Sequence, residues 1–358
     1  MKKFDSDIRF RKDFISLSNK IKETGIVETE DADFDFLPTL RCNLTCNHCR
    51  QDEVRKDNDW TEIKDEMSFE QVKKAWDNIA IEGKIVKING GEPFIRKDMF
   101  DILQYFKGRG AYNIIATNTT IFSKKENLNR LRECGLVEIT CSLDGIGKTH
   151  DMVRRQKGLF DTVCNFVKEL SKDHKILIEC CVQKENVDEL PKILSMKKEL
   201  GIYKIRFQLP VFATCSDVEE AASVLGEKIN YEAQIKESPN YDFTFEDFVE
   251  SYNIMNRDGA AFDMHPKYFD LSSELCLNRN IRSKYNLICT YMFRSKIDPN
   301  GDVRFCPYII KSFGNILKEP FEEIWNSEEF MKFRKKIINN NMLPSCENCP
   351  HLRIDSRK

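Results

Sequence analysis

Short apolar runs alternate with amphipathic segments along residues 34–209 of this chain. We expect strands at the apolar runs, over 34–40, 84–89, 112–117, 136–143, 176–182 and 204–209. Between them, apolar residues recur every three or four positions, which predicts helices over 68–81, 98–107, 123–133, 160–171 and 187–200. Strands separated by helices of this length are typical of parallel βαβ units. The sequence therefore predicts an α/β fold, a partial (β/α)6 barrel and not a closed eight-fold one.

The rest of the chain is less regular. Residues 1–33 are polar and charged and are expected to form a helical or irregular lead-in. Beyond 210 the alternation stops, and only 218–235 and 245–255 have helical spacing. The predicted organisation is a lead-in over 1–33, the barrel over 34–212, a helical or irregular segment that covers the substrate over 213–285, and a small cysteine-rich domain over 286–358.

Composition excludes several classes of partner. The 358 residues are 41% apolar and 32% charged, with a net charge of −2, so the chain has enough apolar material for a large core. No block of one sign stands out, which gives no reason to expect nucleic acid or a membrane surface as partner. The N-terminus has no apolar core of a signal peptide, and no stretch approaches the length of a membrane span. We therefore expect a cytoplasmic protein.

Polar motifs follow the predicted strands at their carboxyl ends, where parallel α/β folds place their active sites. Three cysteines follow the first strand, a Gly-Gly-Glu-Pro run follows the second, and Asn118 ends the third. The fourth strand ends in Ser142 and Asp144, and Gln183 ends the fifth. A single site at this edge of the sheet is the expected consequence.

The first cysteine motif suggests a metal cluster. Cys42, Cys46 and Cys49 have the spacing C-x3-C-x2-C and supply three thiolates from one short loop. A cubane iron–sulfur cluster has four irons, so one iron is left without a protein ligand and can bind a small molecule. Zinc is the alternative, but a closed structural zinc site normally takes four protein ligands.

This set of motifs resembles the radical SAM superfamily, and the resemblance covers the whole predicted barrel. It implies that Cys42, Cys46 and Cys49 bind a [4Fe–4S] cluster whose open iron is chelated by S-adenosylmethionine (SAM). The run Gly90, Gly91, Glu92 and Pro93 matches the family's GGEP motif, whose backbone meets the methionyl amino group of SAM. Bare backbone can approach a ligand closely only where side chains are absent.

The resemblance also implies further SAM contacts. His48 occupies the position of a planar side chain against the adenine, and Ser142 and Asp144 match the ribose-side segment. Arg154 lies where a basic residue often meets the ribose or the carboxylate, and Asn118 and Gln183 are further expected contacts. Taken alone, His48 could be a surface loop residue, and Arg154 a solvated charge like its neighbour Arg155.

A second cysteine set stands near the end of the chain. It comprises Cys289, Cys306, Cys346 and Cys349. Residues 297–305 read as strand, Asn-Gly turn and strand, and such a hairpin brings the first two cysteines together. The set resembles the twitch or SPASM extension of radical SAM enzymes, which carries an auxiliary [4Fe–4S] cluster. A full SPASM domain has seven cysteines, so this chain matches a single-cluster version; a four-thiolate zinc site is the alternative. The scattered cysteines are expected to be mostly core residues.

The resemblance implies an oxidoreductase or maturase with two [4Fe–4S] clusters and SAM. Reductive cleavage of SAM would give a 5′-deoxyadenosyl radical that abstracts hydrogen from substrate, and the auxiliary cluster would take the second electron. A base is then required near the substrate, with Glu179 and Gln183 among the unassigned candidates. The expected reaction is peptide or protein maturation of the RiPP type, with a flavodoxin- or ferredoxin-type reductant. The alternatives are a dehydrogenase or epimerase of a sugar or aminocyclitol, and a non-enzymatic metal scaffold.

Overall fold

The computed structural model describes residues 14–49, 66–209, 211–230, 234–235, 245–257, 261–265, 281–347 and 349–357. Its main feature is a ten-stranded sheet in the order β13-β12-β11-β1-β2-β3-β4-β5-β6-β9. The six expected strands lie at its centre: β1 (Asp33–Thr39), β2 (Ile85–Gly90), β3 (Tyr112–Thr117), β4 (Leu136–Ser142), β5 (Ile176–Cys181) and β6 (Lys204–Gln208). All neighbours from β11 through to β9 run parallel. The predicted partial barrel is thus confirmed.

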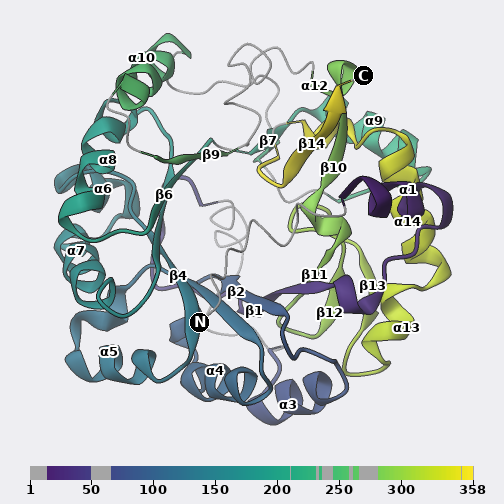
Figure 1. The fold of residues 1–358 in the computed structure, drawn as a ribbon, viewed down its shortest axis with the longest axis horizontal. Coiled ribbons are helices and arrows are strands. Elements are labelled where there is room, and N and C mark those ends of the chain that lie inside the picture. The colour runs from purple at the N-terminus through teal and green to yellow at the C-terminus, as the bar shows by residue number, and fades with distance from the viewer. Residues whose placement is uncertain are drawn as a thin grey trace.

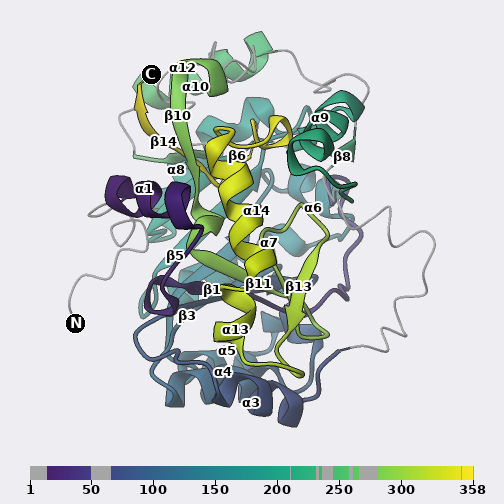
Figure 2. The same ribbon diagram turned by 90° about the vertical axis from the view of Figure 1, so that its right-hand side faces the viewer.

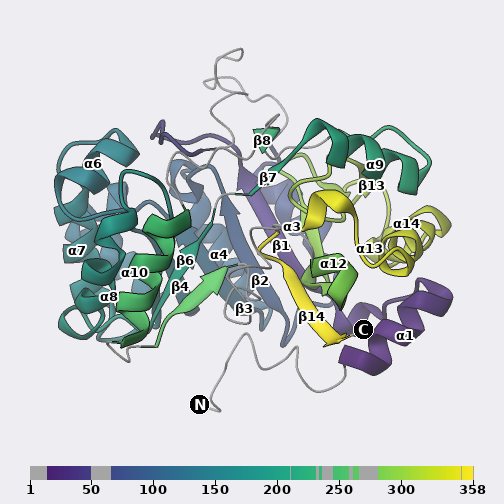
Figure 3. The ribbon, with the colours of Figure 1, turned by 90° about the horizontal axis from the view of Figure 1, so that it is seen from above.

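Helices cover the outer face of the curved sheet (Figures 1 and 3). The expected ones are α3 (Phe69–Asp77), α4 (Met99–Gly108), α5 (Lys125–Arg132), α7 (Leu159–Leu170) and α8 (Leu190–Glu199), and α6 (Lys148–Arg154) is a further helix that the sequence did not predict. Short 3-10 turns accompany them: η3 (Pro93–Ile95), η4 (Thr120–Ser123) and η5 (Val187–Glu189). The first helix begins as the sequence predicts, because Ser68 and Gln71 form a reciprocal capping box.

Apart from β3, which has Ile114 and Ala116 at its inner positions, the central strands alternate between an apolar outer face and an inner face that carries polar or charged residues. On β1, Phe34 and Phe36 contact Trp76 of α3 edge-on, with ring centroids 5.1 and 5.4 Å apart. Asp35 points the other way, and its carboxylate accepts a hydrogen bond of 2.7 Å from Asn89 of β2. The outer residues bury apolar surface against the helices, which is the main stabilising contribution to the fold.

The segment 213–285 contributes to the sheet, which the sequence did not predict. The described elements near and within it are β7 (Phe212–Ala213), α9 (Cys215–Leu225), β8 (Gln234–Ile235), α10 (Phe245–Arg257), β9 (Asp263–His265) and α12 (Ile281–Lys284). Strand β9 pairs with β6 as a further parallel strand. The helix expected over 218–235 is wrong beyond Leu225, because Gly226 has φ +70° and ends α9.

The C-terminal part continues the sheet beyond β1. Its elements are β10 (Tyr285–Cys289), η7 (Thr290–Met292), β11 (Arg294–Ile297), β12 (Asp302–Arg304), β13 (Ser312–Asn315), α13 (Phe321–Trp325), α14 (Glu328–Asn339), η8 (Pro344–Cys346) and β14 (Leu352–Arg357). Strands β11 and β12 form the predicted hairpin, and β10 pairs antiparallel with β14.

The start of the described chain packs against this end of it. After α1 (Phe14–Thr24), η1 (Thr29–Asp31) leads into β1. Figure 2 shows α1 beside α14, and Arg334 of α14 donates to the carbonyl of Gly25 at 3.2 Å. No helix in the described ranges is long and apolar enough to cross a membrane. The domain boundaries given above stay a prediction.

Candidate active site at the strand ends

The first cysteine set lies in the loop after β1, fastened to the glycine segment after β2. The amide of Gly91 donates to the carbonyl of Thr39 at 3.1 Å, and that of Glu92 to the carbonyl of Arg41 at 2.8 Å. The loop is held from the other side by Asn47, whose amide donates to the carbonyl of Val153 in α6 at 3.0 Å. Two segments distant in sequence, the glycine segment and α6, therefore fix the backbone that carries the thiols.

The two glycines are required by this close approach. A Cβ atom at Gly90 would lie 2.2 Å from the carbonyl oxygen of Thr39, and one at Gly91 would lie 1.9 Å from that of Arg41. Gly90 also has φ +136°, which side chains disfavour. The absent side chains were expected to make room for a ligand, whereas in the structure the cysteine loop itself already requires their absence.

An ion-pair cluster supports the start of the loop. Arg41 donates to both carboxylate oxygens of Glu66, at 3.1 and 2.8 Å, and the hydroxyl of Thr39 also donates to Glu66. Arg96 donates to the carbonyl of Pro38 at 3.0 Å. Bidentate arginine pairs of this kind restrict geometry as well as adding energy, so the backbone just before Cys42 is held firmly.

Glu92 ties the glycine segment to the end of β3. Its buried carboxylate accepts hydrogen bonds from the hydroxyl of Thr117 at 2.9 Å, the amide of Asn118 at 2.6 Å and the amide of Phe94 at 3.2 Å. Burial raises its pKa to about 7 despite these bonds. Glu92 thus fixes the glycine segment against the end of β3. Pro93, also buried, begins η3 directly after it.

Asn118 reaches the cysteine loop directly. Its side-chain amide donates to the sulfur of Cys42 at 3.8 Å and to the side chain of Asn43 at 2.9 Å. Its side-chain oxygen in turn accepts from the backbone and hydroxyl of Thr120. The residue expected to contact SAM therefore lies beside the first cysteine.

Asp144, just after β4, is the charged group around which the other side of the site is organised. Its fully buried carboxylate accepts from the Arg154 guanidinium and from the amide of Cys181 at 2.8 Å. Burial acts to raise the pKa of Asp144, but the Arg154 charge outweighs it and holds that pKa below its usual value. Arg154 also donates to the sulfur of Cys46 at 3.7 Å. Its neighbour Arg155 is exposed and donates to Asn47, so the structure separates the two arginines.

His48 turns toward the same side of the site. Its Nδ1 lies 3.0 Å from the side-chain amide nitrogen of Gln183, and its Nε2 lies 3.8 Å from the carboxylate of Asp144. Burial lowers the pKa of His48 to about 4, so the ring is neutral at pH 7. Ser142 ends β4 opposite Glu179 of β5. The structure thus brings the expected SAM contacts to one edge of the sheet.

Two residues that position Asp144 were not singled out from the sequence. The ring of His150 accepts from the amide of Asp144 at 3.0 Å, and Asn186 donates to the carbonyl of Asp144 at 3.1 Å. Asn186 also donates to the carbonyl of Cys181 at 2.8 Å. Both residues are fully buried. The sequence gives little indication of either residue, since the role of a buried His or Asn in a loop depends on the hydrogen bonds that it makes in the folded chain.

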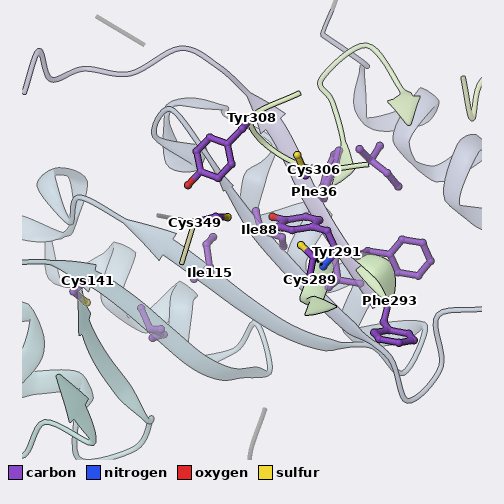
Figure 4. Packing of buried hydrophobic residues seen from close by; sticks show 14 of the residues in the cluster. Phe36, Ile88, Ile115, Cys141, Cys289, Tyr291, Phe293, Cys306, Tyr308 and Cys349 are labelled. Atoms are coloured by element: carbon purple, nitrogen blue, oxygen red, sulfur yellow. Dashed lines mark hydrogen bonds between the residues drawn. The ribbon is translucent and has the colours of Figure 1, made fainter. Parts of the chain in front are cut away.

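The second cysteine set surrounds the end of β10. Cys289 ends this strand, Cys306 follows the hairpin, and Cys346 and Cys349 belong to the turn before β14. Figure 4 shows Cys289, Cys306 and Cys349 near Tyr291. Burial raises the pKa of Cys349, and three other thiols raise it further: Cys289, Cys346 and Cys306. The four thiols therefore lie within range of one another's charge.

Two thiols of the second set accept hydrogen bonds from backbone amides. The amide of Tyr291 donates to the sulfur of Cys289, and that of Ile309 to the sulfur of Cys306, each at 3.4 Å. Hydrogen bonds to sulfur and burial are the means by which proteins tune iron–sulfur clusters. Among the described residues, no group of three or more His, Cys, Asp or Glu side chains is arranged to hold a metal ion.

The scattered cysteines, expected to be mostly core residues, are Cys134, Cys141, Cys164, Cys180, Cys181, Cys215 and Cys276. Three are fully buried in the core: Cys134, Cys141 and Cys180. Cys164 and Cys181 are half-buried, but Cys215, at the start of α9, is exposed, so the core assignment is wrong there. Cys276 lies outside the described residues.

Comparisons with known proteins agree with this geometry. Residues 36–196 match the model of the radical SAM superfamily, and residues 289–350 match that of an iron–sulfur cluster-binding domain, SPASM. The chain is 27% identical to an AdoMet-dependent heme synthase of Methanosarcina barkeri, over 88% of this chain and 87% of the relative. It is 25% identical to the mycofactocin maturase MftC of Mycolicibacterium smegmatis, over 87% and 74%.

Solved structures share the fold. Streptococcus suis SuiB bound to S-adenosylmethionine has a TM-score of 0.59 at 15% identity, covering 92% of this chain and 71% of SuiB. SuiB has also been solved bound to its precursor peptide SuiA, with a TM-score of 0.56 at 17% identity, covering 89% and 71%. At these identities the likeness shows the fold alone.

Proposed function

We propose that this chain, a radical SAM enzyme with a C-terminal SPASM-type domain, oxidises a C–H bond of a peptide or protein substrate. As a radical SAM enzyme, the chain binds iron–sulfur clusters and SAM. The observation that carries the proposal is the convergence of three segments at the strand ends: the cysteine loop, the glycine segment and the Asp144–Arg154 pair. A structural metal site needs only the first of these.

The residues of the first site fit a [4Fe–4S] cluster with one open iron. Cys42, Cys46 and Cys49 would hold it, since three thiolates leave one iron free for the amino and carboxylate groups of SAM. When bound, this cluster would supply one electron for reductive cleavage of SAM to methionine and a 5′-deoxyadenosyl radical, the species that would remove hydrogen from the substrate. The protein's part is to hold the reactants and exclude other donors.

Two groups of residues, on opposite sides of the cysteine loop, would share this task. On one side, Glu92 fixes the glycine segment against the cysteine loop, so that its backbone groups keep a constant position. On the other, the carboxylate of Asp144 and the guanidinium of Arg154 form a buried pair that faces Cys46. We expect the two sides to take the methionyl and the ribose ends of SAM respectively.

The second cysteine set would take the electron that remains on the substrate after hydrogen removal. Four cysteines leave no iron open, so this site suits electron transfer better than substrate binding. Loss of a hydrogen atom, a proton and an electron together amounts to a two-electron oxidation. The first cluster would draw its electron from a flavodoxin- or ferredoxin-type protein.

A peptide or protein substrate is favoured by two likenesses. One relative is named a maturase, and SuiB, which has the same fold, has been solved with a precursor peptide. A tetrapyrrole is the second candidate, because another relative is named a heme synthase and the alignment spans 87% of its length. The sugar and aminocyclitol alternative stays a prediction.

The proposal is tested by anaerobic reconstitution with iron and sulfide, followed by incubation with SAM and dithionite. We expect 5′-deoxyadenosine from the wild type and none from the variant Cys42→Ala, Cys46→Ala, Cys49→Ala. The variant Cys134→Ala, which removes a buried thiol remote from both sets, serves as control and should retain the activity. Absence of 5′-deoxyadenosine from the reconstituted wild type would contradict the proposal.

A further inference from the structure

The inner face of the curved sheet carries several charged and polar side chains, which is unusual for parallel strands. Parallel sheets normally bury both faces and consist of near-continuous apolar runs. Here the apolar outer residues Ile88, Ile139, Ile178 and Phe207 belong to the core. The alternate positions hold charged and polar residues together with some apolar ones, such as Ile114 of β3 in register with Lys87. We define the inner face by Asp35, Lys87, Asn89, Glu138, Ser142, Glu179 and Arg206. Charged groups in such positions are costly unless they serve a ligand or one another.

Strand register puts these residues side by side. Asp35 lies between Lys296 of β11 and Lys87 of β2. At the other side of the sheet, Glu179 pairs in register with Arg206, which in turn is opposite Asp263 of β9. The inner face therefore has basic residues on both sides.

Most acidic groups of the inner face are already engaged. Asp35 accepts from Asn89 at 2.7 Å and from the hydroxyl of Tyr291. Glu179 lies 3.4 Å from the guanidinium of Arg206. Lys87, by contrast, is half-buried and has no hydrogen bond or ion pair with any residue of the described ranges. Its ammonium group is thus available to an external anion.

The second cysteine set adjoins the inner face on the side of Lys87. His351 lies two residues after Cys349, and its ring contacts that of Tyr291 edge-on, with centroids 4.8 Å apart. The hydroxyl of Tyr291 donates to Asp35, which lies in register with Lys87. Lys87 therefore lies on the part of the inner face that is next to the second cysteine set.

We propose that Lys87 binds a carboxylate of the substrate on the inner face, between the two cysteine sets. This rests on the proposed function and specifies its substrate class as anionic. Lys87 lies three residues before Gly90 on the same strand, about 10 Å along it. A substrate held there has its acidic group near the second cysteine set and its remaining length directed toward the SAM site. Either an acidic peptide side chain or a tetrapyrrole carboxylate supplies this chemistry.

Binding to the reconstituted protein tests this without any turnover. The probes are coproporphyrin III, followed by its absorbance, and a hexaglutamate peptide, followed by calorimetry; their neutral counterparts are the porphyrin tetramethyl ester and hexaglutamine. We expect one acidic probe to bind and its neutral counterpart to bind at least tenfold more weakly. Lys87→Gln should weaken that binding by about tenfold or more, and Lys87→Arg should restore most of it.

The control is Lys168→Gln, which removes an exposed lysine on the outer face of α7 and should leave binding unchanged. Binding of the porphyrin alone indicates a tetrapyrrole substrate, and binding of the peptide alone an acidic peptide; each supports the proposal. It is overturned if neither acidic probe binds, or if Lys87→Gln binds as the wild type does. Failure of the proposed function would appear separately, as absence of 5′-deoxyadenosine.

Discussion

The guanidinium of Arg154 donates to the sulfur of Cys46 at 3.7 Å while it also pairs with the buried carboxylate of Asp144. One side chain therefore links the cysteine loop after β1 with the turn after β4. A planar guanidinium can make both contacts at once, because its donors are fixed in a fork. The contact joins Cys46, a proposed cluster ligand, to the residues expected to face the SAM ribose.

Arg154→Lys is expected to reduce 5′-deoxyadenosine formation by about tenfold or more, because a lysine keeps the charge but cannot hold both partners in this geometry. The initial rate under dithionite, with iron per chain determined on the same sample, is the measurement. Arg132→Lys, on the surface of α5, is the matched control and should retain the wild-type rate. A rate for Arg154→Lys within twofold of wild type would show that the bridge is dispensable.

Glu92 should make the stability of the metal-free protein depend on pH. Burial raises its pKa from 4.5 to about 7 in the folded state. A raised carboxyl pKa contributes stability at low pH that is lost as pH rises toward the folded-state pKa, because the unfolded chain ionises first. From pH 5 to pH 8 this contribution falls by about 2–3 kcal/mol.

The measurement is the free energy of unfolding in urea, at several pH values, for wild type and Glu92→Gln. Glutamine cannot ionise, so the difference between the two proteins should shift against the wild type as pH rises. A difference that stays constant from pH 5 to pH 8 would mean that Glu92 is ionised throughout.

Gly91→Ala tests the close approach of the glycine segment to the cysteine loop. The added Cβ would lie 1.9 Å from the carbonyl oxygen of Arg41, so the two segments must separate, at a cost of about 1–3 kcal/mol in unfolding free energy. Gly108→Ala is the matched control. A Cβ at Gly108, the last residue of α4, meets nothing within 4 Å, and alanine should stabilise the protein by up to about 1 kcal/mol. Equal effects of the two substitutions would refute the steric account.

The hydrogen bond from Tyr291 to Asp35 joins the second cysteine set to the inner face of the barrel. Because both residues are buried, Tyr291→Phe should cost about 1–3 kcal/mol by leaving the carboxylate short of a donor. Combined with Asp35→Asn in a double-mutant cycle, the pair should show a coupling energy of about 1–2 kcal/mol in urea unfolding. Strictly additive effects would indicate that the contact contributes nothing to folding.

The central sheet could be predicted from the sequence because its signals are local. The six strands carry alternating apolar residues, Ser68 marks a helix start, and each polar motif follows a strand directly. Parallel strands then bring Cys42, Gly91 and Asp144 to one edge without further information. The edge strand β9, and the parallel pairing of β11 with β1, could not be found in the same way, because the pairing of β9 with β6 and of β11 with β1 depends on contacts distant in sequence.

The site shows the same division. The cysteines and the glycine segment belong to compact motifs, whereas His150 and Asn186 matter only through hydrogen bonds to Asp144 formed in the folded chain. The helix expected beyond Leu225 failed because a single residue, Gly226, takes a left-handed conformation there. Helical spacing alone does not reveal where a helix ends.

The central claim, two iron–sulfur clusters in one chain, is tested most directly by iron and sulfide per chain after anaerobic reconstitution. We predict about eight irons for the wild type and about four for the variant with Cys42, Cys46 and Cys49 all changed to alanine. Cys306→Ala with Cys349→Ala should also leave about four. About four irons in the wild type, falling to none in the triple variant with one zinc retained, would contradict the claim and remove the auxiliary electron acceptor.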